Sequence, residues 1–332
     1  MRVAVVIPCF RVRAHILPVL SSIGPEVARI FVVDDACPES SGDFVEQSCP
    51  DARVQVLRHA HNLGVGGAVM TGYRAAIDDG YDIIVKLDGD GQMDAGLLPA
   101  FLQPILDGHA DYTKGNRFFD LEAVESMPRS RLVGNAILSF VTKFSSGYWQ
   151  LFDPTNGYTA IHRDVARYLP FDKISHRYFF ETDMLFRLNT LRAVVVDVPM
   201  EARYGDETSN LKIRRIVPEF LAKHARNTLK RIFYNYYLRD MSIASLELPL
   251  GIVLLTFGIG FGSYHWLGHS GGAVASAGTV MLSALPTLIG VQSLLAFLNY
   301  DIASTPSRPF QRRRSHAAAS PAGPGTDTRE AA

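Results

Sequence analysis

The chain has 332 residues, which is room for one large domain or two ordinary ones, and it carries 33 basic and 33 acidic side chains. A formal net charge of zero gives no indication of a nucleic-acid partner, and we expect none. The three cysteines have neither metal-ligand spacing nor the density of a disulfide scaffold, so we expect reduced residues of a cytosolic domain.

Short apolar runs alternate with helical segments along residues 1–90. The first run is too short for a signal peptide and is followed at once by Arg11 and Arg13, so we predict a strand there. This alternation predicts an α/β fold, with a mainly parallel, twisted sheet and helices on both faces. The expected strands are residues 3–7, 30–33, 54–57, 83–87, 158–162 and 193–198, and the expected helices are residues 16–23, 42–49, 69–79 and 182–191.

A basic amphipathic segment is predicted at residues 211–241, after a first domain of residues 1–210. Apolar and aromatic side chains recur there at helical spacing, and the opposite faces carry basic residues such as Lys223, Arg226 and Arg231. Such a helix suits the surface of a membrane. The alternative is a helix that packs on its own domain and leaves its basic face in solvent.

Two uncharged stretches follow, at residues 248–267 and 274–298, and each is long enough to cross a hydrocarbon core, which takes roughly 20 apolar residues. A short Gly- and Ser-rich link joins them, so we predict a transmembrane hairpin over residues 242–300. Basic residues before the first span and at 312–314 after the second predict that the first domain and both termini are cytoplasmic. We therefore expect an integral protein of the cytoplasmic membrane. Its tail, residues 301–332, is expected to be disordered because Ala, Pro, Ser and Gly dominate there.

Acidic residues stand at the ends of two predicted strands: Asp34 and Asp35 at the second, and Asp88 and Asp90 after the fourth. Ligands of open α/β sheets bind beyond the carboxyl ends of the strands. Side chains two residues apart on extended backbone share a face, so Asp88 and Asp90 can address one hard cation or one sugar phosphate. A polar Asp-Gly turn without a ligand is the alternative interpretation of an isolated Asp-x-Asp.

Glycines at residues 62–68 follow the third predicted strand, where they would let backbone amides approach a phosphate at a helix N-terminus. A dinucleotide site is the competing interpretation. Its Gly-x-Gly-x-x-Gly belongs after the first strand, however, with an acid about twenty residues later. Here the acids precede the glycines and the spacing is Gly-x-Gly-Gly, so a nicotinamide enzyme is not expected.

Seven stretches of the chain form a recognisable set. They are Val-Ile-Pro-Cys-Phe at residues 6–10, Val-Asp-Asp at 33–35, Asn-x-Gly-x-Gly-Gly-Ala at 62–68, Asp-x-Asp-x-Gln at 88–92, Gly-Asn-Arg at 115–117, Asp-Pro-Thr-Asn-Gly-Tyr at 153–158 and Phe-Glu-Thr-Asp at 180–183. Together they resemble family 2 glycosyltransferases with the GT-A fold, and more narrowly the membrane-anchored polyprenyl-phosphate sugar transferases of the dolichyl-phosphate mannose synthase type. The two predicted spans match that subgroup by architecture.

The resemblance implies roles for residues in these stretches. Asp183 is the expected general base and Glu181 the second choice, because two residues that far apart on a helix do not share a face. A polyprenyl phosphate is already an oxyanion near neutral pH, and for that acceptor Asp183 would orient substrate or metal instead. The other implied residues are Pro8, Phe10, Asp34, Asp35, Asn62, Gly66, Asp88, Arg117 and Arg203 for a nucleotide-sugar, Asp88, Asp90 and Gln92 for Mg²⁺ or Mn²⁺, and Thr155 and Asn156 on the acceptor side.

Two departures from the family pattern bear on function. Many members carry Asn-Glu where this chain has Arg11 and Val12, which puts a base or ribose contact there in doubt. The Gln-x-x-Arg-Trp signature of processive synthases is absent, so we expect one sugar per turnover. The resemblance implies an inverting transfer from a nucleotide-sugar to a membrane polyprenyl phosphate at the cytoplasmic face. Transfer to a hydroxyl acceptor and a non-catalytic nucleotide-sugar-binding protein are the alternatives, and a homo-oligomer is left open.

Overall fold

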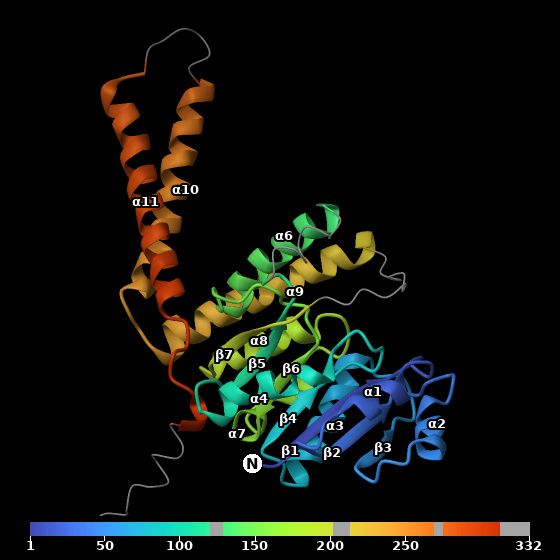
Figure 1. The fold of residues 1–332 in the computed structure, drawn as a ribbon. Helices are drawn as coiled ribbons and strands as arrows, with labels where there is room; N and C mark the ends of the chain where they lie inside the picture. The colour runs from blue at the N-terminus through green and yellow to red at the C-terminus, as the bar shows by residue number, and fades with distance from the viewer. Residues whose placement is uncertain (120–128, 202–212, 269–274, 313–332) are drawn as a thin grey trace, which may run out of the picture.

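The structure, a computed structural model, describes residues 1–119, 129–201, 213–268 and 275–312. One seven-stranded sheet forms its centre, with helices on both faces, and a long helical hairpin projects away from it (Figure 1). The strands are β1 (Val3–Cys9), β2 (Val27–Asp34), β3 (Val54–Arg58), β4 (Ile83–Lys86), β5 (Tyr112–Asn116), β6 (Thr159–His162) and β7 (Val195–Pro199).

The strand order is β3-β2-β1-β4-β6-β5-β7. β1 pairs in parallel with both β2 and β4, β2 pairs in parallel with β3, and β6 alone runs antiparallel to its neighbours β4 and β5. The sheet is therefore mixed but mostly parallel, as expected. The chain extends the sheet to one side of β1 and then crosses to the other side at β4, which creates a topological switch point beside β1.

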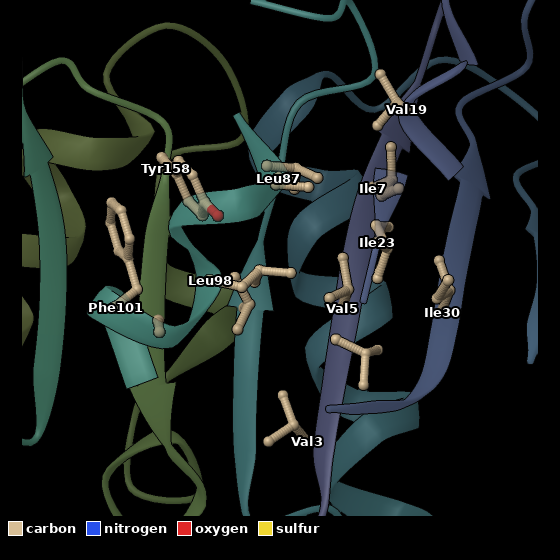
Figure 2. Packing of buried hydrophobic residues seen from close by; sticks show 14 of the residues in the cluster. Val3, Val5, Ile7, Val19, Ile23, Ile30, Leu87, Leu98, Phe101 and Tyr158 are labelled. Carbon is tan, nitrogen blue, oxygen red and sulfur yellow. The ribbon is translucent and has the colours of Figure 1, made fainter. Parts of the chain in front are cut away.

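Two apolar cores cover the two faces of the sheet. Successive residues of β1 alternate between them, so that Val5 and Ile7 face one core while Ala4 and Val6 face the other. Figure 2 shows the first core, where the rings of Phe101 and Tyr158 stack with centroids 3.9 Å apart. The helices of the first core are α1 (Ile16–Ser22), α2 (Ser41–Ser48) and α4 (Leu98–Leu106), and those of the second are α3 (Val65–Asp78), α7 (Arg163–Ala166) and α8 (Phe180–Thr190).

Two further helices, α6 (Arg129–Ser146) and α9 (Ile213–Phe233), lie side by side over one end of the sheet (Figure 1). α9 continues into a turn of π-helix, η3 (Tyr234–Arg239). The inward face of α9 buries His224, Asn227 and Arg231, so the helix packs on its own domain. Its outward face exposes apolar residues such as Leu229, so the packed helix also retains a surface suited to a membrane. Arg231, expected on the basic face, is instead buried, where it pairs with Asp301.

The hairpin consists of α10 (Ala244–Gly268) and α11 (Ala277–Ala303), each with an 18-residue stretch whose mean hydropathy is 1.8 and each long and apolar enough to cross a membrane. Small residues allow the two helices to pack closely. A Cβ on Gly258 would lie 2.3 Å from Thr287 Oγ1, and a Cβ on Gly290 would lie 2.7 Å from the backbone nitrogen of Leu255. Between them, the Ser283 hydroxyl donates to the carbonyl of Gly258 at 2.9 Å.

A buried ion pair joins the hairpin to the domain. Asp301, near the end of α11, accepts two hydrogen bonds from Arg231 of α9, at 2.6 and 3.0 Å. The same carboxylate accepts from Tyr236 at 2.5 Å and from the Trp149 indole at 2.8 Å, while Arg231 Nε donates to the carbonyl of Phe144 at 3.0 Å. Both charged side chains are only 2% exposed. Their complete set of partners explains why Arg231 points inward.

The chain after the hairpin returns to the domain, which differs from the disordered tail expected at residues 301–332. The amides of Phe310 and Gln311 donate to the buried carboxylate of Asp111 at 2.7 and 3.0 Å. The Gln311 side chain donates to the carbonyls of Ile105 and Ala110 at 3.1 and 2.6 Å. Backbone pairing with a buried acid fixes this stretch despite its composition, and residues 313–332 lie outside the described chain.

The ion pair leads to a stability prediction. Asp301→Asn should lower stability by about 3–5 kcal/mol, because it leaves the buried Arg231 guanidinium without a counter-charge. Thermal unfolding of the detergent-solubilised protein measures this. Combining Arg231→Met with Asp301→Leu removes both charges and should recover part of the loss. An unchanged melting temperature for Asp301→Asn would contradict the importance of this joint.

Candidate active site

A cavity of about 430 Å³ opens at the carboxyl ends of the first four strands. Pro8 near the end of β1, Phe10 just after it, Asp35 after β2 and Asn62 after β3 all line it. Its wall continues through Asp88, Gly89 and Asp90 after β4, and through Arg177 and Tyr178 before α8. A larger groove of about 1040 Å³ lies between the outer halves of α10 and α11, but no Asp, Glu, Lys or Arg lines it. The chemistry therefore belongs to the cavity at the strand ends.

The two acids at the end of β2 have different surroundings. Asp34 accepts from the backbone amides of Cys37 at 2.7 Å and Gly42 at 2.6 Å, and it does not line the cavity. Asp34 therefore holds the start of α2, and because it lies outside the cavity lining, a nucleotide contact through Asp34 is not favoured. Asp35 does line the cavity, where His59 Nδ1 lies 2.7 Å from one of its oxygens.

Asp35 also fixes the glycine-rich turn. It accepts from the amides of Leu63 and Gly64, both at 2.8 Å, and the Asn62 side chain donates to its carbonyl at 3.1 Å. Gly64 has a φ of 90°, in the region that favours glycine. One carboxylate thus places the loop after β3 against the end of β2, and Asn62 reaches the cavity as expected.

The Gly66 amide is used by a neighbouring backbone segment and does not point to a phosphate site, which corrects the expectation for Gly66. The Gly66 amide donates to the carbonyl of His176 at 2.8 Å, and a Cβ on Gly66 would lie 2.5 Å from the carbonyl oxygen of Ser175. A Cβ on Gly64 would lie 2.6 Å from the His176 oxygen. These glycines allow two backbone segments to approach each other, a use of glycine that has the same sequence signature as a phosphate loop.

A buried lysine organises the acids beyond β4. Lys86, the last residue of the strand, is 1% exposed, and its ammonium group lies 2.8 Å from Asp88 Oδ1 and 3.6 Å from Glu181 Oε1. Burial would lower the pKa of this ammonium group, but the charges of Asp88 and Glu181 outweigh it and raise the pKa above its ordinary value. Burial raises the pKa of Glu181, although Lys86 opposes that shift.

The expected metal ligands form one turn after β4. Asp88 and Asp90 both line the cavity, and the Gln92 amide donates to Asp90 Oδ1 at 3.0 Å. Within the described residues no three His, Cys, Asp or Glu side chains gather into a complete metal cage. Mg²⁺ commonly takes only one or two protein carboxylates and completes its shell with phosphate oxygens and water. Two carboxylates at the wall of an open cavity fit such an ion.

The loop at residues 153–158 is held by an internal ion pair. Arg117 Nε and Nη2 lie 2.7 and 2.9 Å from the two oxygens of the buried Asp153. Burial would raise the pKa of Asp153, but these hydrogen bonds hold it below its ordinary value. Asn156 is also buried, donating to Asp153 at 3.2 Å and accepting from the Tyr158 amide at 2.9 Å, whereas Thr155 is exposed. Of the expected acceptor-side residues, Thr155 is therefore the accessible one.

The two candidate catalytic acids lie on different faces of α8, as expected. Glu181 faces Lys86 and is 14% exposed, whereas Asp183 is 1% exposed and bonded to Ser175 and Asn227. A general base must reach the acceptor, so the more exposed Glu181 suits that role better than Asp183. Arg203 lies outside the described residues.

Among the residues that sequence reasoning missed are Arg177, Tyr178 and Lys86. Arg177 and Tyr178 line the cavity but belong to an irregular segment that carries no motif. Lys86 could have been found from the sequence. It is a charged residue in an otherwise apolar strand, directly before two acids, and such a charge is expensive to bury without partners.

Gly157→Ala should disrupt the site while leaving the fold intact. A Cβ there would lie 2.3 Å from Lys86 Nζ and 2.5 Å from Asp88 Oδ2, so the ion pair must move. We expect the rate of nucleoside diphosphate release to fall about 100-fold, the usual consequence of a misplacement of about 1 Å. Gly134→Ala on α6, where a Cβ meets nothing within 4 Å, is the matched control. Equal rates for the two variants would contradict the close packing of Gly157 on this pair.

Comparison with known proteins identifies a family and several relatives that are similar to this chain. The family described as "Glycosyl transferase family 2" matches residues 4–169. An undecaprenyl-phosphate mannosyltransferase from Micrococcus luteus is 32% identical over 206 residues, covering 60% of this chain and 83% of the relative. A UDP-N-acetylglucosamine–dolichyl-phosphate N-acetylglucosaminyltransferase from Methanococcus voltae is 30% identical, covering 46% of this chain and 61% of the relative.

Among solved structures, glucosyl-3-phosphoglycerate synthase from Mycobacterium tuberculosis in complex with UDP has a similar fold. The TM-score is 0.54 at 18% identity, over 68% of this chain and 80% of that chain. At this identity the likeness concerns the fold, and it agrees with the GT-A architecture expected from the motifs.

Proposed function

The chain belongs to glycosyl transferase family 2, and on that basis we propose that it moves one sugar per turnover from a nucleotide-sugar to a polyprenyl phosphate in the cytoplasmic membrane. The observation that carries this proposal is the cavity lined by Asp35, Asp88 and Asp90 in a domain to which an apolar hairpin is attached through a buried ion pair. The two relatives named above share a polyprenyl phosphate in their names and differ in the sugar, so the proposal leaves the sugar unspecified.

The donor would lie along the strand ends. Asp35 offers a carboxylate for the base or ribose, beside Pro8 and Phe10 of the β1 end and Asn62. Asp88, Asp90 and Gln92 would hold a divalent cation, Mg²⁺ or Mn²⁺, which when bound neutralises charge on the departing nucleoside diphosphate.

The acceptor phosphate needs little help from a base. Its second pKa is near 6, so at neutral pH an oxygen of the phosphate can attack the anomeric carbon while the bond from that carbon to the nucleoside diphosphate breaks. Attack from the face opposite the leaving group gives inversion. In this scheme Glu181 keeps its place beside Lys86 and Asp88, and Thr155 is the accessible residue on the acceptor side.

The membrane would bring the acceptor to the site. α6 and α9 both expose apolar residues, including Ile137 and Phe140 on α6 and Leu229 and Phe233 on α9. The two helices lie side by side, and α9 leads through η3 into the hairpin (Figure 1). Helices with this pattern lie in the plane of a membrane surface. Basic residues on both sides of the hairpin favour cytoplasmic placement of the domain and both ends.

Transfer to a hydroxyl acceptor is the second candidate. The raised pKa of Glu181 favours it, because a hydroxyl needs a base and a partly desolvated carboxylate is a better one than an exposed carboxylate.

Acceptor assays separate the two candidates. The full-length protein is given a polyprenyl phosphate or the matching polyprenol, together with a panel of nucleotide-sugars. We expect sugar transfer to the phosphate alone, giving a product with a phosphodiester bond. A product whose new bond is a simple glycoside would favour the second candidate and contradict the first.

Replacing Asp90 tests the metal site. Asp90→Asn should lower turnover at least about 100-fold, because the cation that stabilises the leaving group loses a carboxylate ligand. Titration with MnCl₂ should show weaker activation. Asp172→Asn is the control, since that carboxylate is 92% exposed and pairs only with Arg74 among the recorded salt bridges. An unaffected rate for Asp90→Asn would remove the metal-site assignment.

A further inference from the structure

We propose that Asp183 is a positioning residue, which together with Asn227 of α9 holds residues 175–178 in place as one wall of the nucleotide cavity. The proposal rests on the proposed function only in taking this cavity as the donor site.

Both oxygens of the Asp183 carboxylate are engaged. Oδ2 accepts from the Ser175 amide at 2.9 Å and Oδ1 accepts from the Asn227 side chain at 3.0 Å. Asp183 and Asn227 are each 1% exposed. A carboxylate enclosed in this way cannot reach an acceptor in the cavity, but it can tie the segment that begins at Ser175 to α9.

The segment tied by Asp183 forms part of the cavity wall. The carbonyl of His176 accepts from the Gly66 amide, and the Arg177 side chain packs on Gly64, where a Cβ would lie 2.9 Å from Arg177 Cγ. Arg177 and Tyr178 then line the cavity. The wall is thus held from behind by Asp183 and rests in front on the glycine turn.

The wall matters for binding because of its charge. Three carboxylates line the cavity, those of Asp35, Asp88 and Asp90. Among the described residues that line it, Arg177 alone carries a positive charge. A guanidinium group binds phosphate oxygens well, so a displaced wall should weaken the binding of a nucleoside diphosphate.

α9 supports the same segment through its neighbouring turns. The ring of Phe179 packs edge-on against Phe220 and His224, with centroids 5.3 and 5.0 Å away, and Lys223 Nζ lies 3.4 Å from the Ser175 hydroxyl. Asn227 is one turn further along the same buried face of α9. The wall is therefore attached to α9 by several contacts, of which the Asp183–Asn227 hydrogen bond is the most enclosed polar one.

Nucleotide binding by the full-length, detergent-solubilised protein tests the proposal. The probes are UDP and GDP, each with MnCl₂, measured by titration calorimetry. Asn227→Ala should weaken binding of whichever nucleotide binds about tenfold, the scale of one lost buried hydrogen bond. Asn235→Ala is the matched control, because its side chain also bonds to α8, at Asn189, but away from the cavity wall. Equal affinities for the two variants would overturn the proposal.

An exchange of the two partners separates positioning from catalysis. Asp183→Asn should weaken nucleotide binding, and adding Asn227→Asp should restore it to within about threefold, because the hydrogen bond re-forms with donor and acceptor reversed. Normal nucleotide affinity with lost turnover in Asp183→Asn would instead identify Asp183 as the base and overturn the proposal. Restored affinity with restored turnover in the double variant supports it.

Hydrogen exchange tests the attachment of the wall to α9 without any ligand. The Gly66 amide is protected by the His176 carbonyl, so peptides covering residues 64–67 should exchange about tenfold faster in Asn227→Ala than in Asn235→Ala. Unchanged exchange would overturn the attachment of the wall to α9. If the wild-type protein binds neither UDP nor GDP, the donor site proposed above fails, while this comparison still tests the wall.

Discussion

Both the end of strand β4 and the acidic turn of the site depend on the buried ammonium group of Lys86. It ends a fully buried strand, and its only way to keep a charge there is to contact carboxylates. Asp88 and Glu181 supply them from the turn after β4 and from α8, and Gly157 leaves the space that the pair occupies. Three separate segments are thereby drawn to one point, so the position of the acidic turn follows from satisfying one buried charge.

A second layer of contacts connects the site to α9 and the apolar hairpin. α9 buries a row of polar side chains, and each has a separate partner: Asn227 bonds to Asp183, and Arg231 bonds to Asp301 of the hairpin. The helix therefore supports the cavity wall at one turn and contacts the apolar hairpin at the next. α9 has an outward apolar face and an inward polar face. A helix on a membrane surface and a helix packed on its own domain are therefore not exclusive interpretations of its sequence.

Burial on both faces of a sheet, or in lipid, requires a continuous run of apolar residues. This hydrophobic pattern predicted the first four strands and both long apolar helices. It missed β5, whose Lys114 and Asn116 are buried through partners that only the fold supplies. The acidic turn at Asp88 was located correctly because its position depends on a strand end. The sequence could not distinguish between two roles for Gly66 and for Asp183, for a common reason. A glycine that admits a phosphate and one that admits a neighbouring backbone look identical in sequence, as do an acid that serves a substrate and one that serves an amide.

After the hairpin the chain returns to the domain and contacts Asp111. The hairpin is therefore attached to the domain by two chain segments instead of one. A single tether would let the domain swivel about the hairpin. A double attachment removes that swivel, so under the proposed function the mouth of the cavity would stay at a fixed height above the lipids. Encounter with a lipid-borne substrate then reduces to diffusion in two dimensions, and the effective concentration of its headgroup is set by its surface density.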